Sequence, residues 1–245
     1  MILELDCGNS FIKWRVFQPE LAISVSNGVA ASLVELIADV SLCATRLTRA
    51  RLVSVRGDEE TDTLCQDLGR FLNIPVSRAV PARELGGVIN GYEEYDRLGL
   101  DRWLAIVGAY SINHQAALVL DLGTAVTADL VGADGVHLGG YIAPGMPLLR
   151  HQLQAHTRRV RYELSEAALA VKGQGPGRST VEAVERGCLL MLRGFVEAQI
   201  RHARICLGDN AAMFVTGGDA VLVADMPNLS HAPDLIFRGL AIACP

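Results

Sequence analysis

Residues 117–125 read ALVLDLGTA, and residues 2–10 read ILELDCGNS. Each segment is a short apolar run typical of a strand, followed by an Asp-x-Gly turn and small or polar residues. A second strand-like segment follows in both cases, at about 11–17 and 126–131. The copies begin at residues 2 and 117 of a 245-residue chain, so their offset is close to half its length. This repeat predicts two related halves.

Each of the two turns is suited to binding phosphate. Glycine permits a tight turn and lets the backbone approach phosphate oxygens closely, and successive amides form concavities that bind anions. Asn9, Ser10 and Thr124 add hydrogen-bonding side chains, and Lys13 is near enough in sequence to reach a phosphate. An aspartate at a strand end beside phosphates can hold a cation directly or through water. A single Asp-x-Gly also occurs in ordinary hairpins, so the prediction depends on the duplication.

A third element supports the pair of turns. Residues 215–219 read VTGGD and follow an apolar strand at 212–215, where small glycines could admit an adenine or a ribose. Strands and helices alternate along the chain, which is typical of an α/β fold. We therefore expect two duplicated ribonuclease H-like domains with a cleft between them, as in the actin, sugar kinase and Hsp70 superfamily. The expected halves are 1–115 and 116–245, each with one phosphate turn, and the second with a long helix at about 180–204.

The composition excludes several classes of function. The net charge is −5 and the basic residues are scattered, whereas a nucleic-acid-binding protein usually carries a basic stripe. No apolar stretch reaches membrane-spanning length, and we expect a cytoplasmic protein. The six cysteines form no CxxC pair or zinc-type cluster and are interpreted as buried small hydrophobic residues in a reducing compartment.

Shorter motifs narrow the choice within this superfamily. These motifs are DCGNS at 6–10, GLDR at 99–102, DLGTA at 121–125, GGYIAPG at 139–145, Thr180 with Glu182, Ala183 and Gly187, and TGGD at 216–219. In these segments, and over nearly its whole length, the chain resembles the type III pantothenate kinases. The first motif has Ser10 where threonine is usual, which keeps the hydroxyl. Leu100 stands where the family often has proline, a change that alters backbone stiffness and removes no functional group.

The resemblance implies ATP-dependent phosphorylation of pantothenate to 4'-phosphopantothenate, the first step of coenzyme A biosynthesis. It also implies a homodimer and a monovalent cation, K⁺ or ammonium, beside the Mg²⁺ that accompanies ATP. We expect ATP to be bound by Asp6, Cys7, Gly8, Asn9, Ser10, Phe11, Ile12, Lys13 and Thr124. We expect pantothenate to be bound by Tyr92, Gly99, Leu100, Asp101, Arg102 and Thr180, the last supplied across the dimer interface.

Two aspartates receive separate roles. Asp101 is the expected catalytic base, because a carboxylate within hydrogen-bond reach of a primary alcohol can take its proton during phosphoryl transfer. Asp101 is also a favourable helix N-cap residue, which is the structural alternative. By the resemblance, Asp121 is the expected site of the monovalent cation, although a contact with Mg²⁺-bound water is chemically close.

Two other functions compete with this prediction. One is a different kinase or phosphatase of the same superfamily that acts on a sugar or a polyphosphate. The segment at 99–102 and Thr180 count against it. The other is a non-catalytic accessory factor for gene expression, a role that would not require Asp6, Asp101 and Asp121 to be intact.

Overall fold

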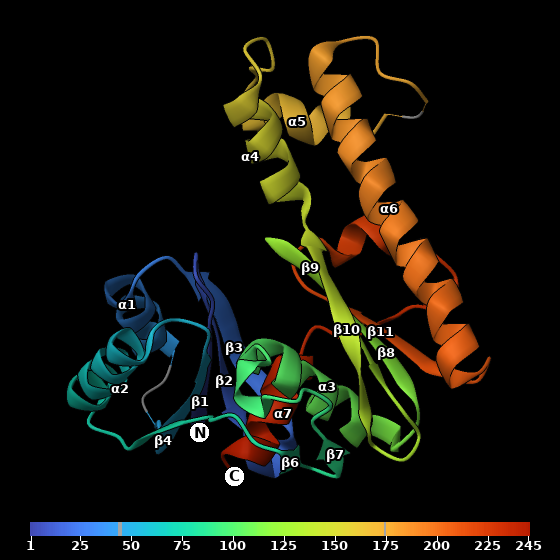
Figure 1. Ribbon diagram of the computed structural model, residues 1–245. Coiled ribbons are helices and arrows are strands. Elements are labelled where there is room, and N and C mark those ends of the chain that lie inside the picture. Colours follow the sequence, from blue (N-terminus) through green and yellow to red (C-terminus); the bar gives the residue numbers. More distant parts are fainter. Residues whose placement is uncertain (44–45, 174) are drawn as a thin grey trace. The chain divides into compact units, whose positions relative to one another are not determined.

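The computed structural model describes residues 1–43, 46–173 and 175–245 and divides into two compact units (Figure 1). The first unit comprises Met1–Asn113 and Asp234–Pro245, and the second comprises His114–Pro233. Among the described residues, no helix is both long and apolar enough to cross a membrane.

The first unit is built on a five-stranded sheet with the order β3-β2-β1-β4-β5. The first three strands form an antiparallel meander, while β4 and β5 run parallel to β1. All six residues of β1 are buried, as expected for a central strand covered on both faces. The strands are β1 (Ile2–Cys7), β2 (Ile12–Gln18), β3 (Ile23–Ala30), β4 (Arg49–Ser54) and β5 (Val76–Arg78).

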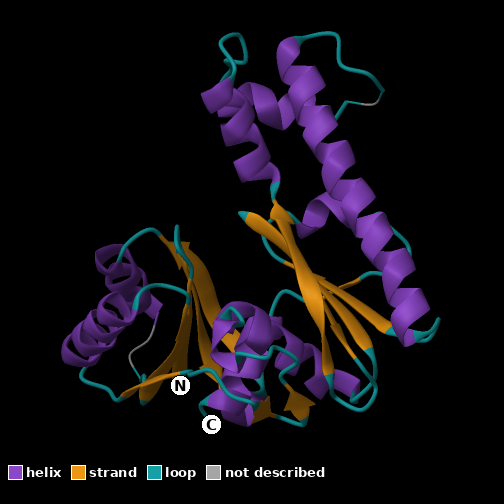
Figure 2. Cartoon of the chain, viewed as in Figure 1, coloured by secondary structure: helices purple, strands orange, loops and turns teal. Residues whose placement is uncertain are grey.

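Helices cover both faces of this first sheet (Figure 2). Leu3 and Leu5 of β1 pack with α1 and α2 in one apolar core. On the opposite face, Glu4 is buried between Arg15 and Arg51, and Arg51 donates to the Cys244 carbonyl just beyond α7 at 2.8 Å. The helices are α1 (Leu33–Cys43), α2 (Asp58–Leu72), α3 (Leu100–Asn113) and α7 (Leu235–Ala243).

The second unit repeats the same sheet topology. Its strand order is β10-β9-β8-β11-β12, again with an antiparallel meander and two parallel strands. Strand β8 therefore corresponds to β1, and β11 corresponds to β4. The strands are β8 (Ala117–Leu122), β9 (Ala125–Val131), β10 (His137–Pro144), β11 (Ala212–Thr216) and β12 (Ser230–His231).

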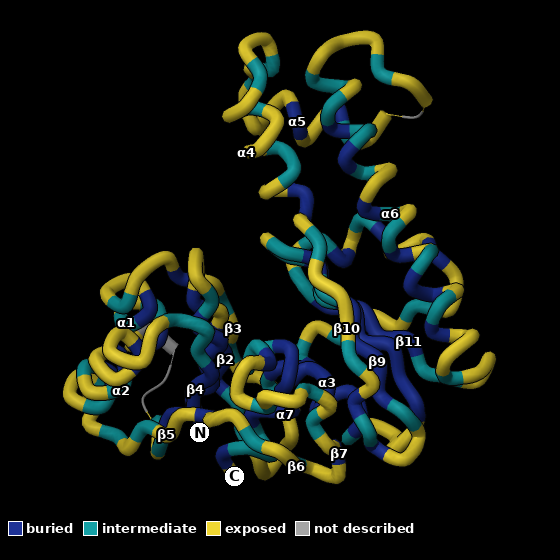
Figure 3. Tube along the Cα trace, viewed as in Figure 1, coloured by how far each residue is buried: buried dark blue, intermediate teal, exposed yellow. Residues whose placement is uncertain are grey.

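One long helix provides most of the helical contribution to the second core. Leu192, Val196 and Ile200 of α6 pack against the apolar side chains of β8 and β9, and much of this sheet is coloured as buried in Figure 3. The shorter helices α4 and α5 pack against α6. The helices are α4 (Met146–His156), α5 (Leu164–Ala170) and α6 (Thr180–Leu207). The matching topology of the two sheets confirms the predicted α/β fold with duplicated halves.

The division of the chain differs from the sequence expectation at its C-terminal end. The expected second half was 116–245, whereas Asp234–Pro245 groups with the first unit. The physical reason is the close crossing of α7 and α3: a Cβ at Gly239 would lie 2.7 Å from the Leu104 carbonyl carbon. Helical periodicity predicts a helix near 234–243, but it does not indicate which half the helix covers.

Several elements lack a sequence signal. Strand β3 is exposed along most of its length, so its apolar pattern is weak, and α5 has only seven residues. The glycine-containing stretch at 80–100 has no clear strand or helix pattern, yet part of it forms a small hairpin of β6 (Glu84–Leu85) and β7 (Val88–Ile89). The expectation that the cysteines are buried is wrong for Cys206, which is exposed, and holds only in part for Cys65, which is half-buried. The side chain of Cys43 lies outside the described residues.

Candidate active site

The first Asp-x-Gly turn joins β1 to β2. Asp6 is buried near the end of β1, and the Gly8 amide donates to the Phe11 carbonyl at 3.0 Å, which closes the turn. Asp6 lies directly opposite Lys13 in the antiparallel pair, so both side chains leave from the same face of the sheet. Lys13 is exposed and its cation is therefore available to a ligand on that face.

The residues at the tip of this turn differ in what they can offer. Asn9, Ser10 and Phe11 are exposed, whereas Ile12 is buried in the core. In the described part of the chain, the amides of Asn9 and Ser10 have no hydrogen-bond acceptor. Burial, with a contribution from the neighbouring Asp6 charge, raises the pKa of the Cys7 thiol to about 12. Cys7 is therefore a neutral packing group at physiological pH and takes part through its backbone.

The sequence prediction missed Arg56, which lies against this turn. Its Nε–H donates to the Gly8 carbonyl at 2.9 Å, and its Nη1 donates to Glu60 Oε1 at 2.9 Å. Because β4 runs parallel to β1, the chain leaving β4 at Ser54 passes beside the turn. The available sequence signal was the short strand-like run RLVSV at 51–55, which Arg56 follows directly.

The predicted substrate residues of the first unit come together at the start of α3. Arg102 is 7% exposed, and its Nη1 donates to the Tyr92 hydroxyl at 2.9 Å. The guanidinium carbon also lies 5.7 Å from the Tyr92 ring centroid, a cation–π distance. The Tyr92 amide is in turn held by the Asn90 side chain at 3.0 Å. Residues ten apart in sequence thus form one polar group.

Asp101 occupies the first turn of α3. Its Oδ1 accepts the Arg102 backbone N–H at 2.7 Å, which fixes the carboxylate at the N-terminal end of the helix. A Cβ at Gly99 would lie 2.9 Å from this oxygen, so glycine leaves room for the carboxylate. Asp101 is therefore the second residue of the helix and not its N-cap, as the structural alternative had it, although its side chain satisfies one free N–H of the first turn. A carboxylate has two oxygens, and one such contact does not prevent it from accepting a proton.

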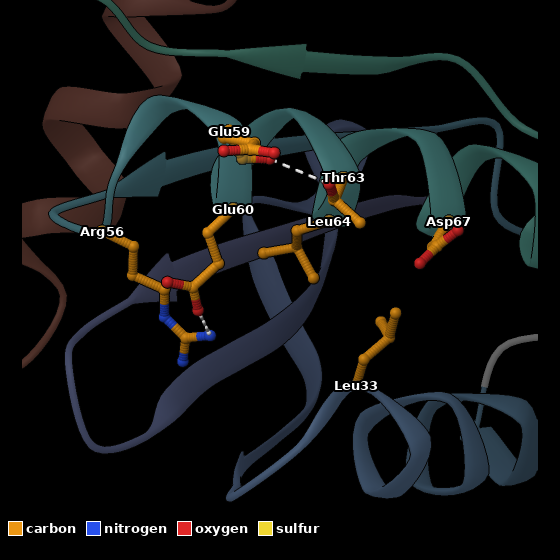
Figure 4. A pocket seen from close by; sticks show the side chains of 7 residues that line it. All are labelled: Leu33, Arg56, Glu59, Glu60, Thr63, Leu64 and Asp67. Carbon is orange, nitrogen blue, oxygen red and sulfur yellow. Dashed lines mark hydrogen bonds and ion pairs between the residues drawn. The ribbon is translucent and has the colours of Figure 1, made fainter.

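Two hollows of the first unit lie beside these residues. One, of about 340 Å³, is at the carboxyl ends of β4 and β5 and is lined by Gly99 and Leu100 together with Arg56. The other, of about 440 Å³, lies between α1 and α2 and is lined by Arg56 and acidic residues of α2 (Figure 4). None of the predicted site residues lines this larger hollow. Arg56 borders both.

The second Asp-x-Gly turn joins β8 to β9 and is one residue shorter than the first turn. Leu122 pairs with Val126, whereas Cys7 pairs with Ile12. The Gly145 amide donates to the Thr124 carbonyl at 3.0 Å. A Cβ at Gly145 would lie 2.8 Å from that oxygen and closer still to the Gly123 carbonyl. Thr124 itself is exposed, so its hydroxyl remains accessible.

A second glycine closes the turn from β11. Gly217 has a φ of +94°, and a Cβ there would lie 2.6 Å from the Leu122 carbonyl carbon and closer still to the Asp121 carboxylate. The Asp219 amide donates to the Leu122 carbonyl at 2.9 Å. Burial raises the pKa of Asp219, and the positive charge of Arg150 opposes the shift. The VTGGD segment thus packs directly on the second turn.

Thr180 begins α6 in the second unit and is exposed. The preceding Ser179 caps the helix by accepting the Glu182 amide at 3.3 Å. Further along α6, Glu185 is 1% exposed and is bound by both Arg150 of α4 and the Tyr162 hydroxyl. This buried network, which the sequence prediction missed, fixes α4 against α6.

The oxygens at the second turn fit a hard cation. Carboxylate, hydroxyl and backbone carbonyl oxygens are the ligands preferred by K⁺-like and Mg²⁺-like ions rather than by transition metals. No group of three or more His, Cys, Asp or Glu side chains that could hold a metal occurs in residues 1–43, 46–173 and 175–245. Any ion at Asp121 would therefore complete its coordination with backbone, water or phosphate oxygens.

Comparisons with known proteins identify the family of this chain. The family profile described as type III pantothenate kinase matches residues 2–202. A type III pantothenate kinase from Pseudomonas syringae pv. syringae is 58% identical and is aligned over 100% of this chain and 99% of that protein.

Solved structures share the fold. A Campylobacter jejuni protein assigned to the Baf family of transcriptional activators has a TM-score of 0.62 at 18% identity, covering 98% of this chain and 95% of that one. A ROK family glucokinase from Streptomyces griseus, with glucose and AMPPNP bound, has a TM-score of 0.53 at 13% identity, covering 98% and 97%. At these identities the likeness shows the fold alone. The family prediction is confirmed by the sequence comparisons: the chain belongs to the type III pantothenate kinase family.

Proposed function

We propose that this chain transfers the γ-phosphoryl group of ATP to the hydroxyl group of pantothenate and forms 4'-phosphopantothenate, the first step of coenzyme A biosynthesis. The observation that carries the proposal is the cluster of Tyr92, Arg102 and Asp101 at the start of α3, in a chain of this family. The cluster combines a cation, a phenol and a carboxylate within one loop and one helical turn. We also infer that the protein acts in the cytoplasm, where ATP is supplied.

Asp101 is the proposed catalytic base. Its carboxylate takes the proton of the attacking hydroxyl as the oxygen–phosphorus bond forms. Arg102 is the proposed partner of an anionic or polar group of pantothenate, because a guanidinium binds carboxylates through paired N–H donors. Its bond to Tyr92 restricts its orientation before the substrate arrives. Gly99 and Leu100 are proposed to line the substrate hollow through their backbone.

The first turn is the proposed site for the ATP phosphates. The amides of Asn9 and Ser10, which have no acceptor among the described residues, supply hydrogen bonds to phosphate oxygens, and Lys13 supplies positive charge. Asp6, on the same face as Lys13, is proposed to face the Mg²⁺ that accompanies ATP, through water. Mg²⁺ neutralises charge on the transferred phosphate. The adjoining Cys7, Gly8, Phe11 and Ile12 shape the turn.

The second turn is the proposed site of the monovalent cation. Asp121 would hold K⁺ or ammonium, and the Thr124 hydroxyl would contact a phosphate oxygen. The bound cation supplies positive charge near the phosphates. The close packing of Gly145 and Gly217 supports this assignment, because it fixes the backbone beside Asp121, and selectivity between cations depends on the rigidity of their ligands.

We infer that the protein is a homodimer in which Thr180 of one chain reaches the substrate site of its partner. Exposed apolar side chains on the second unit support the inference: Leu190 is 72% exposed and Ile142 is 64% exposed. They lie on elements that border an apolar hollow of about 260 Å³ lined by Pro144, Met191 and Phe195. Single chains rarely expose such a surface to water.

A coupled assay tests the proposed reaction. ADP should form only when both pantothenate and ATP are present, and its rate should be higher in K⁺ than in Na⁺. Asp101→Asn should lower turnover by about 10²–10⁴-fold, the usual contribution of a general base, while thermal stability and ATP affinity are kept. Asp134→Asn, in an exposed turn of the second unit, is the control and should keep full activity.

Several outcomes would contradict the proposal. Phosphorylation of a hexose without phosphorylation of pantothenate would assign a different substrate. No turnover with any acceptor would favour the accessory role, and near-normal turnover in Asp101→Asn would remove that residue as the base.

A further inference from the structure

Arg56 contacts the backbone of the first turn from the side of β4. Ser54, the last residue of β4, lies in register beside Cys7, the last residue of β1. The chain therefore passes the turn immediately after the strand, and the Nε–H of Arg56 reaches the Gly8 carbonyl at 2.9 Å. The side chain of Arg56 is 16% exposed, so water competes weakly for this bond.

Three contacts fix the guanidinium and the backbone behind it. Glu60 accepts Nη1 at 2.9 Å in the i,i+4 arrangement of Figure 4. Ser54 Oγ accepts the Arg56 backbone N–H at 3.2 Å, and the Thr61 hydroxyl donates to the same oxygen at 2.9 Å. Because the rotamer of Arg56 is held at both ends, little conformational entropy is lost when the turn binds a ligand.

The hydrogen bond from Arg56 to the Gly8 carbonyl determines the direction of the Asn9 N–H, which Arg56 itself does not contact. In a trans peptide the carbonyl oxygen of one residue and the N–H of the next point in opposite directions. No peptide bond of the described residues is cis. With the Gly8 oxygen directed at Arg56, the Asn9 N–H must point away from it. The Gly8 N–H is already used in closing the turn, so the Asn9 amide is the nearest one left for a ligand.

We propose that Arg56 is a positioning residue that holds the Gly8–Asn9 peptide in the orientation that presents the Asn9 N–H to an ATP phosphate. The alternative orientation of this peptide would turn the Gly8 carbonyl toward the phosphate and repel it. This inference rests on the proposed assignment of the first turn to ATP. It concerns a residue outside the motifs by which the chain resembles its family.

Arg56→Met and Arg56→Lys test the role by steady-state kinetics and thermal unfolding of the full chain. In Arg56→Met the KM for ATP should rise about tenfold, the usual effect of losing one hydrogen bond to a charged group. The KM for pantothenate should rise by clearly less than the KM for ATP, because Arg56 borders the substrate hollow but its guanidinium bonds to Gly8 of the ATP turn and to Glu60. Arg56→Lys keeps the charge without the fork of donors and should show a smaller rise in the KM for ATP.

Arg238→Met is the matched control. Arg238 also forms a four-residue-spaced pair with an acidic residue, Asp234, in the same unit. It should keep both KM values. A similar rise in the KM for ATP in this control would mean that loss of any such pair has the effect, and would overturn the proposal.

The remaining outcomes are equally decisive. An unchanged KM for ATP in Arg56→Met, or a parallel rise in both KM values with a lower melting temperature, would overturn the positioning role. If Arg56→Met does not fold, the same criteria apply to Arg56→Lys. Asp6→Asn distinguishes failure of this inference from failure of the proposed ATP site. If Asp6→Asn also leaves the KM and kcat for ATP unchanged, the assignment of the first turn to ATP is itself wrong.

Discussion

The two Asp-x-Gly turns have the same topology and opposite surroundings. Both follow the central strand of a five-stranded sheet, and in each the glycine amide donates to a carbonyl across the turn at 3.0 Å. The first turn has an exposed tip, and the Arg56 side chain holds it by a hydrogen bond to the Gly8 carbonyl. The second is enclosed by the backbone at Gly145 and Gly217, where no side chain fits.

The difference indicates two ways of making a binding loop from one fold. A loop held by a side chain keeps its tip free and can adjust to a large ligand such as a triphosphate. A loop enclosed by backbone atoms has fixed oxygens and suits a small ion. Duplication supplied the position of each turn, and the neighbouring residues then made the turns chemically unequal.

Adding one methyl group to the enclosing residue should break the second turn. In Gly145→Ala the new Cβ would lie 2.8 Å from the Thr124 carbonyl and closer still to that of Gly123. Backbone atoms cannot move aside cheaply, so we expect a loss of about 3 kcal/mol in the free energy of unfolding, at the upper end for overpacking. Thermal unfolding should show a melting temperature lower by about 6 °C or more.

The matched controls place alanine at the glycine of each turn. In Gly123→Ala the nearest contact of the Cβ is at 3.8 Å, and in Gly8→Ala it is at 3.3 Å, neither with positive φ. Both variants should stay within about 1 kcal/mol of the wild type. Equal stability of Gly145→Ala and Gly123→Ala would show that the second turn is not enclosed as described.

Much of the fold and part of the candidate site could be predicted from the sequence. The predicted strands at 1–6 and 116–120 and the turns after them are local features, and their duplication predicted the matched topology. Gly145 was identified as the last residue of the GGYIAPG segment, but its packing against the second turn was not, because that contact joins segments 22 residues apart. Arg56 and the buried pair of Arg150 and Glu185 depend in the same way on long-range packing, to which local patterns are blind.

Removing the charge of each turn's aspartate should separate the two roles. In Asp121→Asn we expect the K⁺ concentration for half-maximal activity to rise by about 10- to 100-fold, because a charged ligand of the ion is lost. In Asp6→Asn we expect kcat/KM for ATP to fall while the half-activating K⁺ concentration changes by less than about twofold. Titration of activity with KCl at constant ionic strength measures both.

Two results would reverse the comparison of the turns. If Asp6→Asn shifts the K⁺ dependence and Asp121→Asn does not, the cation belongs to the first turn. If activity in Na⁺ equals that in K⁺ for the unaltered chain, neither turn selects a monovalent cation. A melting temperature for each variant excludes general loss of structure as the cause.

The substrate cluster shows where motif matching and geometry meet. The resemblance implies that Tyr92 and Arg102 each contact the substrate, and the structure joins the two side chains by a hydrogen bond of 2.9 Å. Thr180 belongs to the second unit, and the proposed dimer is what connects it to the substrate. The motif indicated which residues to consider, whereas the contact between two of them required the fold.

The smallest effect concerns the carboxylate beside the enclosed turn. Burial raises the pKa of Asp219 above the ordinary value of 3.8, so the folded chain holds this proton more tightly than the unfolded chain does. The associated stability is present below pH 3.8 and is lost as the pH rises through the folded-state pKa. Asp219→Asn cannot ionise, and at pH 7 it should melt about 1–3 °C above the wild type. The difference should shrink as the pH is lowered toward 4.

Asp225→Asn provides a control of opposite sign. The hydrogen bond from Arg193 lowers the pKa of Asp225, so its stabilising contribution is present above pH 3.8 and is lost as the pH falls through the folded-state value. Asp225→Asn should therefore melt slightly below the wild type at pH 7. If both variants melt below the wild type at pH 7, the surroundings of Asp219 stabilise its ionised carboxylate by more than the desolvation caused by burial destabilises it. The surroundings of the second turn would then be polar rather than enclosed, because the Asp219 carboxylate stays charged at no cost only where its oxygens are solvated or paired.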